Sequence, residues 1–145
     1  MITKKEILNK GFESNPILEQ KENKSGDFVE MVSLVLHSRT QTHTLHLQTK
    51  SFAEHKALNE YYDGIGDIID GLIESYQGKY DILEGYKSYD LVNYKSTEAT
   101  IKYLKELDGK VEKLRNCCKD SFIQNQIDNV NELINSTLYK LRFLK

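Results

Sequence analysis

The sequence has 145 residues, a length typical of one domain that can bury a core without disulfides or metal. Its 20 basic and 22 acidic residues nearly cancel, which argues against nonspecific nucleic-acid binding, because such binding needs a clearly basic face. The apolar runs are only a few residues long, so no segment is predicted to span a membrane.

The composition favours helices throughout. Pro16 is the single proline, and Lys, Glu, Leu and Ile are abundant, so we predict an all-α fold. Cys117 and Cys118 are the two cysteines, and adjacent cysteines rarely bridge to each other. We therefore expect ordinary thiols in a reducing, cytoplasmic compartment. A redox or metal site at this pair is the alternative, although neither a CxxC spacing nor a second cysteine pair supports it.

Residues 1–25 are polar and are predicted to form a partly flexible N-terminal extension, with a short helix near Lys4–Lys10 and a break at Ser14–Pro16. Five lysines and four glutamates in this stretch give only weak support for a DNA-binding arm. The bundle domain is predicted over 26–145. Its first helix is expected to start near Gly26, with Asp27 as N-cap, and to end near Thr49–Lys50.

This first helix is expected to bury Met31, Leu34 or Val35, and Leu45, with small residues at Ser38 and Thr42. Thr40–Thr49 also alternates with a period of two, so a short strand is the competing interpretation. The second helix is predicted over 51–78. Ser51 and Glu54 form a capping-box pattern, and Gly78 is expected to end the helix in the left-handed conformation. Its apolar positions are Phe52, Leu58, Tyr62, Ile65, Ile69 and Leu72 or Ile73.

Residues 79–95 are weakly periodic and are predicted to be a connector containing one short helix. The third helix is expected from a Ser96 cap to about Cys118, and the fourth follows a turn at Lys119–Asp120. Their apolar residues recur at helical spacing: Ile101, Leu104, Leu107, Val111 and Leu114, then Ile123, Ile127, Val130, Ile134, Leu138 and Leu141. Two short turns and one long crossover between the second and third helices match the ferritin type of four-helix bundle.

The second helix carries a polar stripe, in which residues spaced by three or four share one face. Asp70 and Glu74 are four apart, close enough to hold one metal ion, and oxygen and imidazole ligands suit iron, manganese or zinc. The stripe comprises His55, Asn59, Asp63, Gly66, Asp67, Asp70 and Glu74. Gly64 and Gly66 inside the helix suggest close backbone approach by a neighbour, because each costs about 1 kcal/mol relative to alanine.

Helix geometry limits how this stripe can bind metal. His55 and Asp70 are fifteen residues apart, or roughly 22 Å at the rise of an α-helix, so they cannot share an ion within one chain. A second copy packed antiparallel would place its Asp70 and Glu74 opposite His55. A metal site here therefore predicts a two-fold dimer with two symmetric sites, and His46 could add a second imidazole across the turn.

Plainer interpretations exist for several of the polar residues. Acidic side chains on a helix face are usually solvated, and we expect this for Asp63 and Asp67. His37 and His43 are predicted to be surface residues and not ligands.

The segment from His46 to Gly78 resembles the ferroxidase segment of the Dps-type miniferritins, in the ferritin-like superfamily. His55, Asp70 and Glu74 match the family spacing, and His46 stands in for the first histidine across a turn about three residues shorter than usual. The ten residues from His46 to His55, HLQTKSFAEH, also resemble uncharacterised ferritin-like proteins of tailed bacteriophages. Asn59 stands where the family usually has an acidic ligand, and Leu47 where it commonly has an aromatic residue.

The resemblance implies a homo-oligomer with iron (or another divalent metal) at dimer-interface sites, a hollow cage of twelve subunits, and oxidation of ferrous iron by peroxide or oxygen. The metal ligands would be His46, His55, Asp70 and Glu74, with Asn59 as a poorer ligand. Two functions stay open. One is a cytoplasmic metal-binding protein that oxidises and sequesters ferrous iron. The other is a phage structural or interaction protein, found in the host cytoplasm or the virion, that keeps the bundle without iron chemistry.

Overall fold

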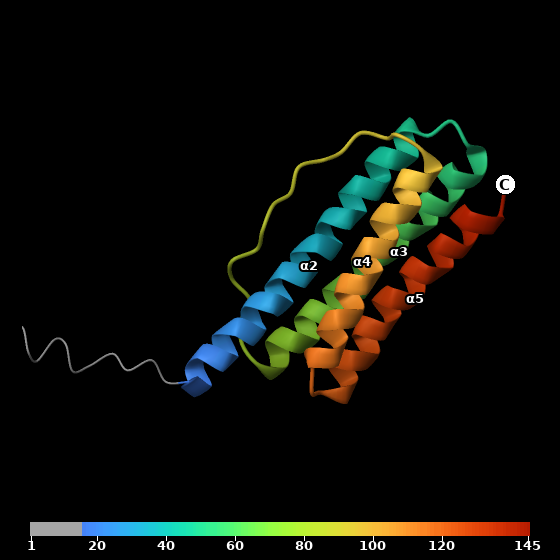
Figure 1. The fold of residues 1–145 in the computed structure, drawn as a ribbon. Coiled ribbons are helices and arrows are strands. Elements are labelled where there is room, and N and C mark those ends of the chain that lie inside the picture. The colour runs from blue at the N-terminus through green and yellow to red at the C-terminus, as the bar shows by residue number, and fades with distance from the viewer. Residues whose placement is uncertain (1–15) are drawn as a thin grey trace, which may run out of the picture.

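Four long helices form a bundle in the computed structural model, which describes the backbone of residues 16–145 and the side chains of residues 25–145 (Figure 1). The helices are α2 (Pro16–Gln48), α3 (Phe52–Lys79), α4 (Thr97–Cys117) and α5 (Ser121–Phe143). The predicted all-α class is confirmed. Among the described helices, none combines the length and apolarity that a bilayer span requires.

The direction of the helices follows from the lengths of their connections. Residues 49–51 join α2 to α3, and residues 118–120 join α4 to α5, so each pair is antiparallel. Residues 80–96 instead return along the whole bundle, and α4 therefore runs parallel to α3 (Figure 1). This arrangement brings the start of α3 and the end of α5 to the same end of the molecule.

The first helix begins earlier than the sequence indicated. Gly26 and Asp27 lie inside α2, so the predicted helix start near Gly26 and the Asp27 N-cap are wrong. The helix can begin at Pro16 because proline is favoured at the first helical position, where its missing N–H would have no partner in the helix. The competing strand at Thr40–Thr49 is also excluded, since α2 is helical through Gln48. The short helix predicted near Lys4–Lys10 lies outside the described residues.

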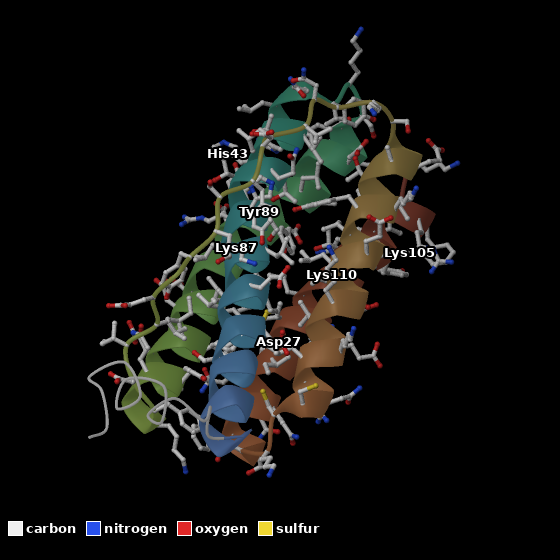
Figure 2. The ribbon with its side chains drawn as sticks, turned by 60° about the vertical axis from the view of Figure 1, so that its left-hand side comes forward. Asp27, His43, Lys87, Tyr89, Lys105 and Lys110 are labelled. Atoms are coloured by element: carbon white, nitrogen blue, oxygen red, sulfur yellow. The ribbon has the colours of Figure 1, made fainter. Side chains whose placement is uncertain are left out.

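The crossover contains no helix, contrary to prediction: residues 81–96 are irregular. Polar side chains of α2 bind its backbone. The Gln41 side chain donates to Val92 O and accepts from Val92 N, both at 2.7 Å, while Gln48 Oε1 accepts from Tyr94 N at 2.7 Å. Ser33 Oγ accepts from Lys87 N at 3.0 Å. The crossover is therefore held along α2, where Lys87 and Tyr89 lie in Figure 2.

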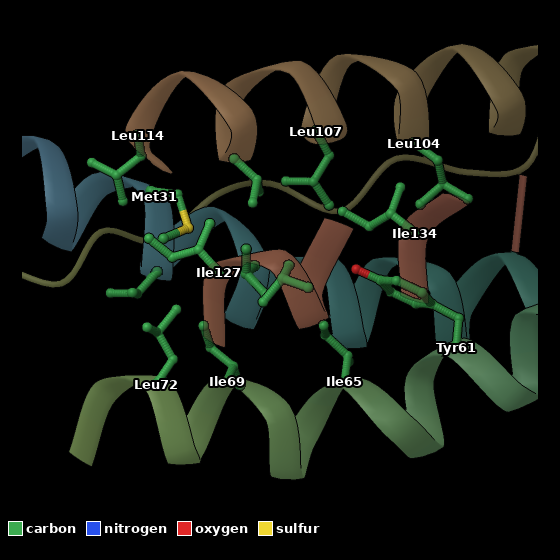
Figure 3. Close-up of a cluster of buried hydrophobic side chains, with 14 of the residues drawn as sticks. Met31, Tyr61, Ile65, Ile69, Leu72, Leu104, Leu107, Leu114, Ile127 and Ile134 are labelled. Carbon is green, nitrogen blue, oxygen red and sulfur yellow. The ribbon is translucent and has the colours of Figure 1, made fainter. Parts of the chain in front are cut away.

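The core forms from one apolar face of each helix (Figure 3). Leucine, isoleucine and valine side chains of α3, α4 and α5 meet at its centre, and the predicted apolar positions of α5 are all buried. Tyr61 is fully buried, and its hydroxyl lies 2.7 Å from Ser38 Oγ. Phe52 was predicted to be apolar core but is exposed, because it occupies the first position of α3 at the end of the bundle.

Two predicted helix ends differ in detail. The second helix continues one residue beyond Gly78 to Lys79, and Gly78 does not adopt a positive φ angle; among the described glycines only Gly85 does, at 82°. The Ser96 and Ser51 caps are confirmed: each hydroxyl accepts a hydrogen bond from the backbone N–H three residues later. The fourth helix begins directly after the predicted Lys119–Asp120 turn.

Candidate metal-binding site

His46 and His55 face each other across the short connection between α2 and α3. Their rings are stacked, with centroids 3.7 Å apart and planes 20° from parallel. His46 Nδ1 lies 2.7 Å from the His55 carbonyl oxygen, and His55 Nδ1 lies 2.9 Å from the His46 carbonyl oxygen. A carbonyl can only accept, so both Nδ1 atoms carry hydrogen. In each neutral ring the lone pair is therefore on Nε2, the atom that can bind a metal.

Two further aromatic rings surround this histidine pair. His43, one turn earlier on α2, stacks on Tyr62 with centroids 4.3 Å apart, and its centroid is 5.9 Å from that of His46. Tyr62 meets the His46 ring edge-on at 5.1 Å. His43 is exposed, as predicted, but it also belongs to the aromatic cluster. The sequence signal for this was the three-residue spacing of His43 and His46, which places both on one helix face.

Glu54 fixes the start of α3, and with it the position of His55. The Glu54 side chain is 3% exposed, and its Oε2 accepts hydrogen bonds from Thr49 Oγ1 (3.0 Å), Tyr94 OH (2.9 Å) and Thr97 Oγ1 (2.9 Å). The predicted capping box is therefore altered. The Ser51 N–H donates to Thr49 Oγ1 at 3.2 Å and not to Glu54, so Thr49 links the two. Sequence reasoning missed that Glu54 joins three segments of the chain.

The amide of Asn59 is already engaged on both sides. Its Oδ1 accepts a hydrogen bond from the Tyr62 hydroxyl at 2.7 Å, and its Nδ2 donates to Asp63 Oδ2 at 2.9 Å. Asn59 could bind a metal through Oδ1 only by sharing or breaking the bond to Tyr62. Its arrangement is that of a positioning residue for the Tyr62 ring, which packs against His43 and His46.

Asp70 and Glu74 lie farther along α3 and are both exposed. The helix is continuous from Phe52 to Lys79, so roughly 22 Å separates His55 from Asp70 along its axis. One chain therefore brings His46 and His55 together but does not bring them to Asp70 and Glu74. Within the described residues, no three His, Cys, Asp or Glu side chains are grouped closely enough to hold a metal ion.

Arg39 lies between these two parts of the stripe. A Cβ atom on Gly66 would come within 3.2 Å of the Arg39 guanidinium carbon, so the glycine lets this cation lie against α3. A Cβ on Gly64 would meet the Leu133 side chain at 3.4 Å. The approach predicted at both glycines is thus made by side chains and not by a neighbouring backbone. Asp63 and Asp67 are exposed, as expected for solvated residues.

His37 is placed apart from the histidine cluster. Its ring lies 5.5 Å from that of Tyr89 in the crossover, and partial burial lowers its pKa.

Comparison with known proteins gives one match. The model of a family of unknown function (DUF5856) matches residues 46–141, which begins at His46 and includes His55, Asp70 and Glu74. No curated protein and no solved structure matches the chain. The family match covers well over half of the sequence, and the chain belongs to this family of unknown function.

Proposed function

We propose that this protein is a ferritin-like, Dps-like metal-binding protein that holds divalent iron at the interface of a two-fold dimer. His46 and His55 of one copy and Asp70 and Glu74 of the second copy form each of two equivalent sites. The parallel α3 and α4 helices joined by a long crossover, as in the ferritin type of bundle, support this proposal.

The observation that carries the proposal is the pair of reciprocal hydrogen bonds between His46 and His55. Each bond fixes one ring and leaves its Nε2 lone pair for a ligand. Metal-binding histidines commonly donate their second nitrogen to a carbonyl or carboxylate in this way, because the bond fixes the tautomer and the ring orientation.

The donor set fits ferrous iron as a substrate. Imidazole nitrogens and carboxylate oxygens both bind ferrous iron, and two carboxylates balance the charge of one divalent ion. Asn59 contributes no charge where an acidic ligand would add one, so we expect one ion per site. Transfer of the iron's electron to oxygen or peroxide would make the protein a ferroxidase, and assembly into a cage would let it sequester the product.

A mixing experiment tests whether each site is shared between copies. The double variants His46→Ala/His55→Ala and Asp70→Ala/Glu74→Ala should each lose ferrous or cobaltous binding in anaerobic calorimetry. Refolding the two together should restore one of the two sites in each mixed dimer, because that site regains all four ligands and the other site lacks them all. Asp63→Ala/Asp67→Ala removes two exposed acids from the same helix and serves as the matched control, with wild-type binding expected.

Three outcomes would overturn the shared site. Binding retained by both double variants would show that the four residues are not ligands, and failure of the mixture to recover binding would remove the two-fold arrangement. An equal loss of metal binding in the Asp63→Ala/Asp67→Ala control would show that the acidic residues of α3 attract metal ions without forming a specific site. The oxidation rate of ferrous iron in air is then measured separately. A dimer that binds metal but does not speed this oxidation would support the shared metal site and contradict the ferroxidase activity.

The bond from Tyr62 to Asn59 favours a second function, a structural or interaction protein without iron chemistry. It engages the one amide oxygen that could replace the usual acidic ligand. Exposed apolar side chains at the shared end of α3 and α5 would then be contact surfaces: Phe52, Tyr139, Phe143 and Leu144. Purified protein that assembles through this end and contains no metal by elemental analysis would support this function over the first.

A further inference from the structure

A second concave site lies at the end of the bundle opposite the histidine cluster. It is a cavity of about 490 Å³ where Ser25, Asp27 and Phe28 of α2, the end of α3, the first crossover residues and the α4–α5 turn converge. Its volume is in the range of small-molecule sites, which are commonly apolar with a few polar groups. In Figure 2, Asp27 marks this end and His43 the other.

One wall of the cavity is a series of three aromatic rings. Phe28 and Tyr76 are stacked with centroids 3.8 Å apart, and Tyr76 and Tyr80 follow at 4.8 Å with planes 41° apart. Phe28 is buried, Tyr76 is half-buried and Tyr80 is exposed, so the series runs from the core to the surface. The faces of such rings carry negative potential and attract cations.

The charged groups of the cavity are mostly acidic. Asp27, Asp81 and Asp120 line it, whereas Lys119 is the one basic residue among its lining side chains in the described part of the chain. Asp120 also lies 3.5 Å from Lys79, so that carboxylate is already partly neutralised. Asp27 and Asp81 form no ion pair with any described residue, so they are the two carboxylates of the cavity that are available to pair with a bound cation.

Tyr80 connects the aromatic wall to the acidic groups. Its hydroxyl donates a hydrogen bond to Asp120, and this bond raises the pKa of Tyr80 to about 12. The hydrogen bond to Asp120 also holds the Tyr80 ring at the mouth of the cavity. Tyr80 directly follows α3, so the ring is fixed at both its backbone and its hydroxyl.

We propose that this cavity binds a small organic cation with an alkylated ammonium group, held by the aromatic face of Tyr80, whose ring is supported by Tyr76, and by the carboxylates of Asp27 and Asp81. Aromatic rings beside carboxylates favour such a cation over an inorganic ion, because the apolar groups on nitrogen replace water against the rings. The apolar floor provided by Phe28 and Leu83 would contact the rest of the ligand.

The test uses choline and its uncharged analogue 3,3-dimethylbutan-1-ol, which share a shape and differ in charge. Titration of the isotope-labelled full chain by NMR should show choline-dependent shifts at Tyr76, Tyr80 and Leu83, with binding of the alcohol at least about tenfold weaker. Choline should also slow alkylation of Cys117, which is exposed and lines the same cavity. Equal binding of the two compounds would overturn the charge selectivity that the proposal requires.

Variants separate the aromatic and acidic contributions. Tyr80→Ala should weaken choline binding roughly three- to thirty-fold, the range expected for loss of one cation–π contact. Tyr139→Ala is its matched control, because Tyr139 and Tyr80 are both 55% exposed, and only Tyr80 lines the cavity. Asp27→Asn should weaken binding as well, with Asp67→Asn on α3 as control. Wild-type affinity in both Tyr80→Ala and Asp27→Asn would overturn the proposal, and metal binding at the histidine end would be unaffected.

Discussion

Single side chains in this bundle connect segments that are distant in sequence. Glu54 is the clearest case, since one carboxylate oxygen accepts hydrogen bonds from the α2–α3 turn, the crossover and the start of α4. Its other oxygen, Oε1, is buried and has no hydrogen-bond partner among the described residues. A buried acid arranged in this way contributes to stability through the hydroxyl groups that it satisfies.

Glu54→Ala should therefore destabilise the fold by about 2–4 kcal/mol, because three part-buried hydroxyls lose their acceptor. Glu54→Gln keeps one acceptor oxygen and should cost less. The free energy of unfolding in urea measures both. Glu98→Ala, which removes an exposed acid from the first turn of α4, should change it by no more than about 0.5 kcal/mol. Equal effects of Glu54→Ala and Glu98→Ala would contradict this role of Glu54.

Tyr61 gives a prediction for alkaline pH. The Ser38 hydroxyl donates to Val35 O at 2.6 Å, so Tyr61 must donate to Ser38. Burial raises the pKa of Tyr61 above the 10.0 of an exposed phenol, since the ionised form is penalised in the core. The unfolded chain then loses this proton first. Stability contributed by the neutral phenol is complete below pH 10 and falls as the pH rises above it.

Tyr61→Phe should accordingly cost about 1 kcal/mol at neutral pH through the lost hydrogen bond, and it should reduce the loss of stability above pH 10. Urea unfolding at neutral pH and above pH 10 measures both effects. Tyr139→Phe, at an exposed position, should leave both values as in the wild type. An unchanged alkaline slope in Tyr61→Phe would contradict this role of Tyr61 and would point to another tyrosine with a raised pKa, such as the partly buried Tyr103.

The helices show which elements the sequence specifies locally. Caps at Ser51 and Ser96 and the apolar repeat of α5 predicted three of the four helices closely, because these signals lie within a few residues of the structure that they determine. The crossover could not be predicted in the same way. Its backbone is bound by Ser33, Gln41 and Gln48, more than forty residues earlier in the chain.

The candidate site shows the same division. The spacing of His55, Asp70 and Glu74 along one helix was evident from sequence, and His46 could be placed beside His55 across a short turn. The reciprocal bonds between the two histidines, the stacking of His43 on Tyr62 and the engagement of Asn59 were not. Each depends on how α2 packs against α3, which no local pattern specifies.

Gln41→Ala should release the middle of the crossover while leaving the bundle folded. The Gln41 side chain is the hydrogen-bond partner of both the N–H and the carbonyl of Val92. We therefore expect faster amide exchange at Val92 and faster proteolysis within 87–94. The free energy of unfolding should fall by about 1–2 kcal/mol. Hydrogen exchange followed by mass spectrometry measures the first effect. Thr40→Ala changes the adjacent, exposed residue of α2 and should leave exchange in the crossover unaltered.

At the scale of the whole molecule, the division of ligands between copies links metal binding to assembly. If His46 and His55 bind the same ion as Asp70 and Glu74 of a second copy, metal must stabilise the dimer by mass action. Sedimentation velocity at low micromolar protein should show more dimer when anaerobic ferrous or cobaltous ion is added. His55→Ala should abolish this shift, and Asp67→Ala should not. A dimer population that does not change when metal is added would contradict this link between metal binding and assembly.

The hydrogen bonds between the crossover and α2 also fix the length of the crossover segment between them. Ser33 to Gln48 spans fifteen helical residues, or roughly 22 Å, and the bound segment from Lys87 to Tyr94 spans seven residues, or about 23 Å when extended. The two distances agree only while the crossover stays nearly straight. A one-residue deletion between these anchors would shorten it by about 3.3 Å and break at least one of them. Insertions and deletions that leave this fold intact are therefore expected outside 87–94, although long surface connections usually tolerate them anywhere.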